Sequence, residues 1–359
     1  MKFGISLYPG LGMSRKEQRA RIHRAAAYGI TRLFTSLHIP ETDETHFVEE
    51  WQAMLTAAKS AGLAVIADAS PAALKRFTPP PFTAHSLTGL GLDVLRLDDG
   101  FSPADIARLS RSEGNPRLLL NASTIKERDL ATLQTEGADF TRLEALHNFY
   151  PRPGTGLSLA FFCRQNELLH HYGLSIGAFL PAAKGRRAPL HEGLPTLEMH
   201  RTMPPNLAAR HLAALGVDSI FIGDDKPSDA EIATLVAITP DTVALRARLL
   251  IKDTALQDLL SQPFTARPDA ARDALRAMEG RTRFHDIPLP PENTLPRPFG
   301  AITVDNQTYP RYAGELQIIK RPQGADPRTN VVAQVLPEEH FLIPLIRPGQ
   351  KFTLHFQGY

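Results

Sequence analysis

The chain has 359 residues, of which 43% are hydrophobic and 22% charged, an ordinary composition for a globular protein with one large and one small domain. Its 40 Lys and Arg against 38 Asp and Glu give a net charge of +2, which argues against a nucleic-acid or membrane-surface partner. The single cysteine, Cys163, excludes an internal disulfide and a Cys-based zinc cluster within one chain. The N-terminus MKFGISLYPG shows no secretion-signal pattern and no stretch approaches bilayer-spanning length, so we expect a cytoplasmic protein.

Short apolar strands alternate with helices over roughly the first 235 residues. Strands are predicted at 3–7, 30–35, 63–67, 93–97, 118–120, 140–146, 174–180 and 219–222. Helices are predicted from Ser14 to Gly29, at 44–61, partly at 70–89, after Ser102, from Thr124 to about 135, at 157–171 and after Ser228. Eight such units are typical of a closed (β/α)8 TIM barrel. An open doubly wound sheet competes, but Gly10-Leu11-Gly12 lacks the third glycine of its phosphate loop.

The character of the sequence changes after about residue 260. Weak helical periodicity runs to Gly280, and a proline-rich stretch extends from Pro288 to Pro298. Short β-like runs are then predicted at 300–304, 312–319, 330–336 and 352–356, which indicates a small all-β barrel or sandwich. We therefore place a catalytic barrel at residues 1–240, a connecting helix or linker at 241–263 and a β domain at 264–359.

Polar residues recur where the barrel strands end. In a TIM barrel the active site lies at the carboxyl ends of the strands. The residues expected there as substrate contacts are Ser6, Tyr8, Asp68, Arg96, Asn121, His147 and Asn148. Each Asp, Asn or Ser there also suits a helix N-cap, but their recurrence around the barrel favours a ligand site.

Two loops add further candidates. The stretch LEALHNFYPRPGTGLS, 143–158, holds Tyr150, Arg152 and Thr155 between prolines and glycines that fix its backbone. The long segment 181–203 after the seventh strand contributes Thr196, Glu198, His200 and Arg201. We expect Arg152 and Arg201 to bind a phosphate group through fork-like contacts. Alternatively, Glu198 and Arg201 form an i,i+3 ion pair on a short helix.

The motifs of other chemistries are missing from the sequence. It contains no H-E-x-x-H zinc motif and no G-x-S-x-G serine elbow, so we expect no metal and no serine nucleophile. Paired carboxylates remain, and glycoside cleavage needs one acid and one base or nucleophile. We expect Asp98 and Glu198 to be this catalytic pair, with Glu144 and Asp68 in reserve. Strand alternation is expected to turn Glu144 outward, opposite to Ala145.

Several of these motifs together resemble the MupG-like family of 6-phospho-N-acetylmuramidases. They are GISLYP (4–9), TRLFTSL (31–37), LRLDDGF (95–101), LNAST (120–124), HNFYPRPGTGLS (147–158), EGLPTLEMHR (192–201) and AGELQI (313–318). The resemblance implies a TIM barrel followed by a cyclophilin-like β domain. It also implies hydrolysis of the β-1,4 bond of N-acetylmuramic acid 6-phosphate–N-acetylglucosamine in cytoplasmic peptidoglycan recycling, without metal or organic cofactor.

The expected partner is thus a phosphorylated amino-sugar disaccharide, with no nucleic acid and no membrane, and a homodimer as one option. Two other functions stay open. The barrel could be a sugar-phosphate isomerase or lyase, which would create no new reducing end. The β domain could instead make the chain a binding protein.

Overall fold

The computed structural model describes residues 1–37, 47–80 and 82–357 of the chain. The start of the helix predicted at 44–61 lies outside these residues. The chain divides into two compact units: Met1–Leu212 with Gly216–Ile238, and Thr239–Tyr359 with Ala213–Leu215. In the part of the chain that the structure describes, no helix is long and apolar enough to cross a membrane.

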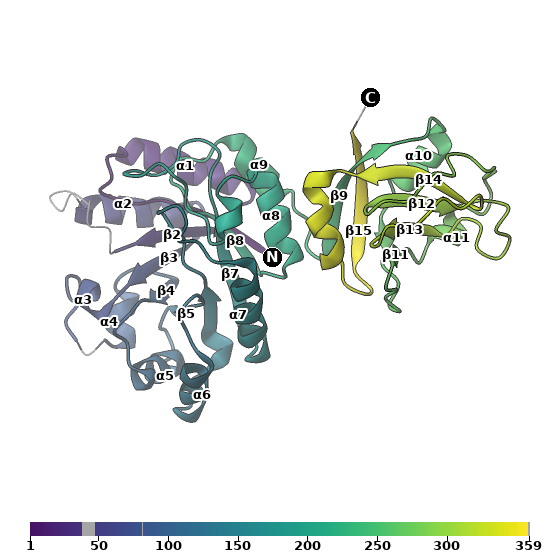
Figure 1. Ribbon diagram of the computed structural model, residues 1–359. Helices are drawn as coiled ribbons and strands as arrows, with labels where there is room; N and C mark the ends of the chain where they lie inside the picture. Colours follow the sequence, from purple (N-terminus) through teal and green to yellow (C-terminus); the bar gives the residue numbers. More distant parts are fainter. Residues whose placement is uncertain (38–46, 81, 358–359) are drawn as a thin grey trace. The chain divides into compact units, whose positions relative to one another are not determined.

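The first unit is a closed parallel β-barrel (Figure 1). Its strands are β1 Lys2–Ser6, β2 Arg32–Ser36, β3 Ala64–Ala69, β4 Val94–Leu97, β5 Arg117–Asn121, β6 Leu143–Leu146, β7 Ser175–Leu180 and β8 Ser219–Ile222. Neighbours in sequence pair in parallel, and β8 pairs back to β1. The predicted TIM barrel is therefore confirmed.

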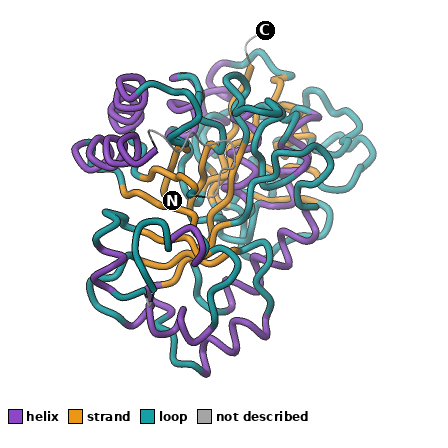
Figure 2. The backbone as a smooth tube through the Cα atoms, turned by 90° about the vertical axis from the view of Figure 1, so that its left-hand side faces the viewer, coloured by secondary structure: helices purple, strands orange, loops and turns teal. Residues whose placement is uncertain are grey.

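Helices follow the strands and surround them, as the purple and orange segments of Figure 2 show. They are α1 Arg15–Tyr28, α2 Phe47–Ser60, α3 Pro71–Leu74, α4 Ala84–Thr88, α5 Pro103–Arg111, α6 Glu127–Thr135, α7 Leu159–His171, α8 Pro205–Ala214 and α9 Asp229–Val236. Short 3-10 turns lie at η1 Phe140–Arg142 and η2 Glu198–His200. The Ser14 hydroxyl accepts from the Glu17 N–H at 3.3 Å and caps α1, as predicted.

Within the barrel, two predicted boundaries were clearly wrong. Helix α6 begins at Glu127 rather than after Thr124, because the amides of Thr124 and Ile125 bond back to the Asn121 carbonyl and form a turn first. Residues 140–142, predicted as strand, form η1, so β6 starts at Leu143.

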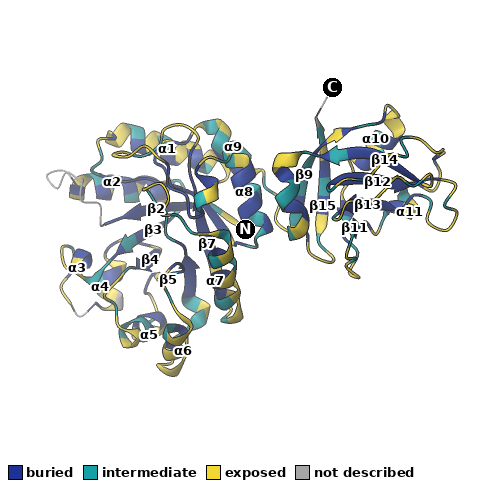
Figure 3. Ribbon diagram, in the orientation of Figure 1, coloured by how far each residue is buried: buried dark blue, intermediate teal, exposed yellow. Residues whose placement is uncertain are grey.

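The barrel interior is filled by one large side chain from most strands. These are Phe34, Ile66, Val94, Leu119, Leu146, Phe179 and Phe221, covered by Tyr8 and Leu194. On β1 the corresponding place belongs to Gly4, since a Cβ there would lie 2.2 Å from the Phe221 ring. The buried strands appear dark blue in Figure 3, inside helices whose outer faces are yellow. Because side chains alternate along a strand, residues two positions after these core residues also face inward, at the carboxyl ends of the strands.

The second unit is a curled seven-stranded sheet in the order β10-β15-β9-β14-β12-β13-β11. Its elements are β9 Thr242–Leu249, α10 Thr254–Leu260, β10 Phe264–Thr265, β11 Ala274–Arg276, α11 Gly280–Arg283, β12 Ala301–Asp305, β13 Leu316–Ile319, β14 Thr329–Val335, η3 Pro337–Leu345 and β15 Lys351–Gln357. The two edge strands meet through an antiparallel bridge between Ala266 and Ala277. The cyclophilin-like character of this unit stays a prediction.

The span 241–263, which we predicted as a connecting helix or linker, holds strand β9 as well as helix α10. Strand β9 pairs with β14 on one side and with β15 on the other, in the interior of the sheet. The reason is visible in TVALRARL, where Val243, Leu245, Ala247 and Leu249 alternate as buried residues.

Candidate active site

The carboxyl end of the barrel carries a ring of inward polar residues from successive strands. Asp68 on β3 and Arg96 on β4 pair in register, each two positions beyond a core residue of its strand. Asn121 ends β5, and Asn148 follows β6 in the same phase. Ser6 ends β1, where it is fully buried. These five predicted substrate contacts therefore lie at the same end of the barrel.

Arg96 is the centre of this ring. Its guanidinium donates to the Asp68 Oδ1 at 2.7 Å, to the Asn148 Oδ1 and, at 3.4 Å, to the Leu146 carbonyl. Only 3% of Arg96 is exposed, so Asp68 supplies the charge that makes burial of this cation tolerable. The network fixes the Asp68 carboxylate and leaves the Asn148 NH2 group without a partner among the described residues.

Asp98 extends the same row one step beyond Arg96. It follows β4 directly, is half-buried, and its backbone N–H donates to the Ala69 carbonyl at 3.1 Å. Asp68 and Asp98 are thus carboxylates on neighbouring strands at the end of the barrel where TIM-barrel chemistry occurs.

Tyr8 closes the barrel core below this ring. Its hydroxyl donates to the Gly223 carbonyl at 2.7 Å, and burial raises the pKa of the phenol, so it stays neutral. The hydroxyl is thus engaged within the protein and is not a free donor for a substrate. The Ser6 hydroxyl oxygen is buried with no hydrogen-bond partner among the described residues.

Arg187, a residue that the sequence analysis did not select, lies over the aromatic rings of Tyr8 and Phe149. The carbon of its guanidinium is 4.6 Å from the centroid of the Tyr8 ring and 5.3 Å from that of the Phe149 ring. Phe149 in turn packs edge-on against Phe179 in the core, with centroids 5.2 Å apart. The only signal in the sequence was an arginine in the loop after the seventh strand.

Glu198 was predicted as a catalytic carboxylate, but the structure engages it fully. Its two oxygens accept from Arg201 Nε at 2.7 Å and Nη2 at 2.8 Å, and from the amides of Gly154 and Gly156 at 2.9 and 2.7 Å. The Arg201 side chain and both amides lower the pKa of Glu198 to about 2. A carboxylate held ionised in this way does not suit a general acid, so Glu198 joins the two loops instead.

Arg201 was predicted to bind phosphate, and this too is corrected. Besides Glu198, its guanidinium donates to the carbonyls of Glu192, Gly193, Tyr150 and Arg152 at 2.9 to 3.3 Å. The residue is 5% exposed. With every N–H direction occupied, it has no donor left for a ligand.

His147 lies behind its strand rather than at the site. It is out of phase with Leu146 and Asn148, so its ring faces α7, 4.6 Å from the Phe162 ring centroid. Its Nδ1 pairs with the Ser123 hydroxyl at 3.1 Å and its Nε2 with the Asn166 Oδ1 at 2.9 Å. Burial lowers its pKa to about 4, so the ring is neutral and structural.

Two further predicted residues also have structural roles. Thr196 is fully buried, where it donates to the Asn148 carbonyl and accepts from the Phe179 N–H, both at 2.9 Å. His200 is fully buried beside His211 on α8, with Nε2 and Nδ1 2.9 Å apart. Thr196 reaches the ring at the barrel mouth only through the backbone carbonyl of Asn148, and the bond between His200 and His211 does not reach it.

Glu144 was predicted to point outward and was held in reserve as a catalyst, and both expectations were wrong. It faces inward but near the amino-terminal end of β6, far along the strand from Asn148. There it makes a two-pronged ion pair with Arg32, at 2.7 and 2.9 Å, that is almost fully buried. This pair belongs to the floor of the barrel, opposite to the catalytic end.

The loop 150–156 keeps a few residues at the surface. Tyr150 is half-buried, whereas Arg152 and Thr155 are exposed. The Thr155 hydroxyl donates to the Arg152 carbonyl at 2.6 Å, which is a local turn contact. Their role in substrate binding stays a prediction.

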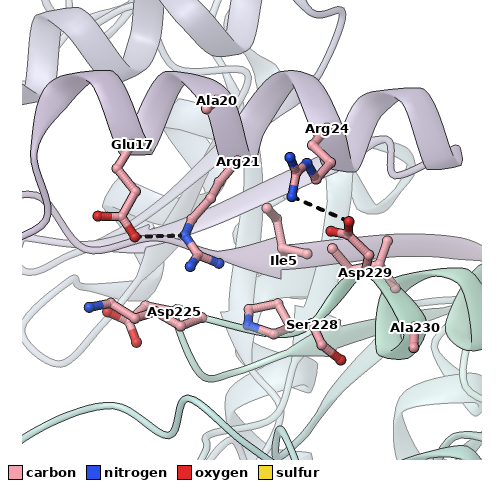
Figure 4. A pocket seen from close by; sticks show the side chains of 12 residues that line it. Ile5, Glu17, Ala20, Arg21, Arg24, Asp225, Ser228, Asp229 and Ala230 are labelled. Atoms are coloured by element: carbon pink, nitrogen blue, oxygen red, sulfur yellow. Dashed lines mark hydrogen bonds and ion pairs between the residues drawn. The ribbon is translucent and has the colours of Figure 1, made fainter.

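A groove of about 670 Å³ lies elsewhere, outside the barrel between α1 and the segment that leads into α9 (Figure 4). Arg21 and Arg24 point from α1 into it, but they pair with Glu17 at 3.2 Å and with Asp229 at 3.3 Å. Its charges are thus largely matched, and its position on the outer face does not suit TIM-barrel catalysis. Among the described residues, no cluster of three His, Cys, Asp or Glu side chains has a geometry for a metal ion.

Comparison with known proteins decides the family. The model for the N-terminal part of 6-phospho-N-acetylmuramidase matches residues 3–237, and that for the C-terminal part matches residues 243–355. The chain belongs to the 6-phospho-N-acetylmuramidase family. This is a family of glycoside hydrolases that act on a phosphorylated amino sugar, so the expected class of enzyme is confirmed.

Two solved structures resemble the whole chain. A B. cereus protein described as uncharacterized is 28% identical over 99% of each chain, with a TM-score of 0.85. A conserved Enterococcus faecalis protein of unknown function is 33% identical over 100% of this chain and 97% of the other, with a TM-score of 0.68. No curated protein sequence matches the chain significantly.

Proposed function

We propose that this protein hydrolyses the β-1,4 bond between N-acetylmuramic acid 6-phosphate and N-acetylglucosamine at the carboxyl end of its barrel. Family membership supports the substrate class. The observation that carries the site is the placement of Asp68 and Asp98 on neighbouring strands there, with Asp68 oriented by Arg96 at 2.7 Å. Glu198 and Glu144, the other two candidates, are engaged in structural ion pairs.

In this mechanism Asp98 protonates the leaving oxygen and Asp68 acts as base or nucleophile. The Asn148 amide and the Asn121 side chain supply neutral hydrogen-bonding groups for sugar hydroxyls. The proposed setting is peptidoglycan recycling in the cytoplasm, which a chain with a single cysteine suits because it needs no oxidising compartment. Assembly as a homodimer is a further proposal, which the molar mass in solution would test.

The deciding experiment incubates the protein with the phosphorylated disaccharide and identifies the products by mass. We expect free N-acetylglucosamine and N-acetylmuramic acid 6-phosphate. An isomerase would leave the mass of the disaccharide unchanged. A lyase would cleave it without adding water, so one of its two products would be lighter by one water than the corresponding hydrolysis product. Either result would replace the hydrolase proposal.

A further inference from the structure

Arg187 is held in place by its own backbone. Its N–H donates to the Asp224 Oδ1 at 2.9 Å, and the other Asp224 oxygen accepts from the Ala182 N–H at 2.8 Å. Asp224 follows β8 and is fully buried. The loop after β7 is therefore anchored to the end of β8, which fixes where the Arg187 side chain leaves the backbone.

The side chain then lies flat on aromatic rings at the barrel mouth. Tyr8 and Phe149, whose ring centroids are 4.6 and 5.3 Å from the guanidinium carbon, both pack on the core of the barrel. A guanidinium stacked on rings loses little freedom when it binds an anion, because its plane is already set.

The other buried arginines near the mouth make hydrogen bonds or ion pairs within the protein, although the Nε of Arg96, like that of Arg187, has no partner among the described residues. Arg186 donates to the carbonyls of Ala182, Glu192 and Arg201 at 3.0 to 3.2 Å. Arg201 is paired with Glu198, and Arg96 with Asp68. Arg186 and Arg201 therefore stabilise loops, and Arg96 orients the Asp68 carboxylate.

Arg187 differs because its guanidinium makes no hydrogen bond or ion pair with any described residue, and its Nε is buried. Asp225 is close enough for its pKa to be influenced by Arg187, but the two form no ion pair. Simple packing on the two rings would leave the Nε–H permanently without an acceptor, which is unfavourable. An anion that accepts from Nε and a terminal nitrogen together would satisfy it.

From these contacts we infer that Arg187 binds the 6-phosphate of the amino sugar and so selects phosphorylated over unphosphorylated substrate. The inference rests on the proposed function and gives this role to Arg187 in place of Arg201. A phosphate monoester offers the paired oxygens that a guanidinium fork recognises. The loop after strand seven is also a frequent phosphate site in TIM barrels.

The test compares Arg187→Gln with the unmodified protein on the phosphorylated and unphosphorylated disaccharides. We expect kcat/KM for the phosphorylated substrate to fall roughly 100-fold, as for the loss of charged hydrogen bonds, mainly through KM. Turnover of the unphosphorylated disaccharide should fall far less, so the preference for phosphate collapses. Arg187→Lys, which keeps the charge but not the fork, should recover part of the loss and covers the case that the glutamine variant folds poorly.

Lys184→Gln is the matched control, because it removes an exposed positive charge from the same loop and should change little. A second arm measures the binding of N-acetylmuramic acid 6-phosphate and of N-acetylmuramic acid by calorimetry. It reports on Arg187 even if neither disaccharide is hydrolysed, in which case only the proposed reaction fails. Unchanged phosphosugar affinity in Arg187→Gln, or a retained preference for the phosphorylated substrate, would overturn the inference.

Discussion

Glu198 and Arg201 form a two-pronged ion pair, Nε–Oε1 2.7 Å and Nη2–Oε2 2.8 Å, three residues apart. The carboxylate also accepts two amides of loop 150–156, while the guanidinium donates to carbonyls of both loops. One pair therefore holds together the two segments whose sequence looked most like an active site. Polar side chains concentrated in glycine- and proline-rich loops can serve the loops themselves.

Glu198→Gln should destabilise the protein more than it impairs chemistry. The change leaves Arg201, which is 5% exposed, without its counter-charge, at a cost of about 3 kcal/mol. Urea unfolding at pH 7 measures the free energy of unfolding. Steady-state kinetics, at a temperature where the variant is folded, measure kcat. We expect a large shift in the unfolding midpoint with kcat lowered less than tenfold. A loss of kcat of about a thousandfold with normal stability would instead restore Glu198 as a catalytic residue.

Much of the fold could be predicted because its signal is local. Alternating apolar strands and capped helices located the strands of the barrel to within a few residues. The C-terminal unit was harder, since β10 has two residues and β11 three, too short for any periodicity. Strand β9 did carry a clear alternation of buried residues. Because it lies between helices α9 and α10, however, we predicted its residues as part of the connecting helix or linker.

The site was predictable only as far as strand phase allowed. Asp68 and Arg96 end up at the mouth because each stands two positions after a core residue. His147 is one residue out of phase, and Glu144 is in phase but at the wrong end of its strand. Loop residues have no such rule, so Arg187 could not be distinguished from Arg186, its structural neighbour.

Glu144→Gln should weaken the barrel floor without affecting the chemistry directly. Although burial alone would raise the pKa of Glu144, hydrogen bonds and charge from Arg32 lower it below the usual value. Its contribution to stability is therefore present above the usual carboxylate pKa of about 4.3 and is lost as the pH falls below that. We expect a loss of about 3 kcal/mol at pH 7 in urea unfolding, and a much smaller difference from the unmodified protein at pH 3.

The double variant Arg32→Met with Glu144→Met controls for the unpaired charge that Glu144→Gln leaves on Arg32. Replacing both partners by apolar side chains of similar length should recover most of the stability that Glu144→Gln loses. If the single variant were fully stable but inactive, the floor assignment would be wrong.

His147→Gln should reduce the sensitivity of stability to mild acid. Burial holds the folded-state pKa of His147 at about 4, whereas the unfolded chain takes up the proton near 6.5. Between these values the unfolded state binds more protons, so stability falls as the pH drops from about 6.5 to about 4. This one residue therefore lowers the free energy of unfolding by about 2 kcal/mol at pH 5 relative to pH 7.

Unfolding midpoints at pH 7 and pH 5 measure this slope. The glutamine variant should be less stable at pH 7 yet lose less on acidification. His200 and His211, whose pKa values burial lowers to about 3 and 4, should keep the remaining slope. An unchanged slope in the variant would show that His147 can be protonated in the folded state.

Asp98→Asn and Asp68→Asn should both abolish turnover but differ in stability. As acid and as base or nucleophile, each is expected to lower kcat by about a thousandfold. Asp68→Asn also leaves the guanidinium of Arg96, which is 3% exposed, without its carboxylate, and should cost about 3 kcal/mol. Asp98→Asn leaves the pair between Asp68 and Arg96 intact, so its unfolding midpoint should move far less.

A double-mutant cycle with Arg96→Gln separates the effect on stability from the effect on catalysis. The stability losses of Asp68→Asn and Arg96→Gln should be strongly non-additive, because both variants break the same ion pair. The losses of Asp98→Asn and Arg96→Gln should nearly add. Full activity in Asp98→Asn would rule out the proposed acid, whatever the stability of the variant.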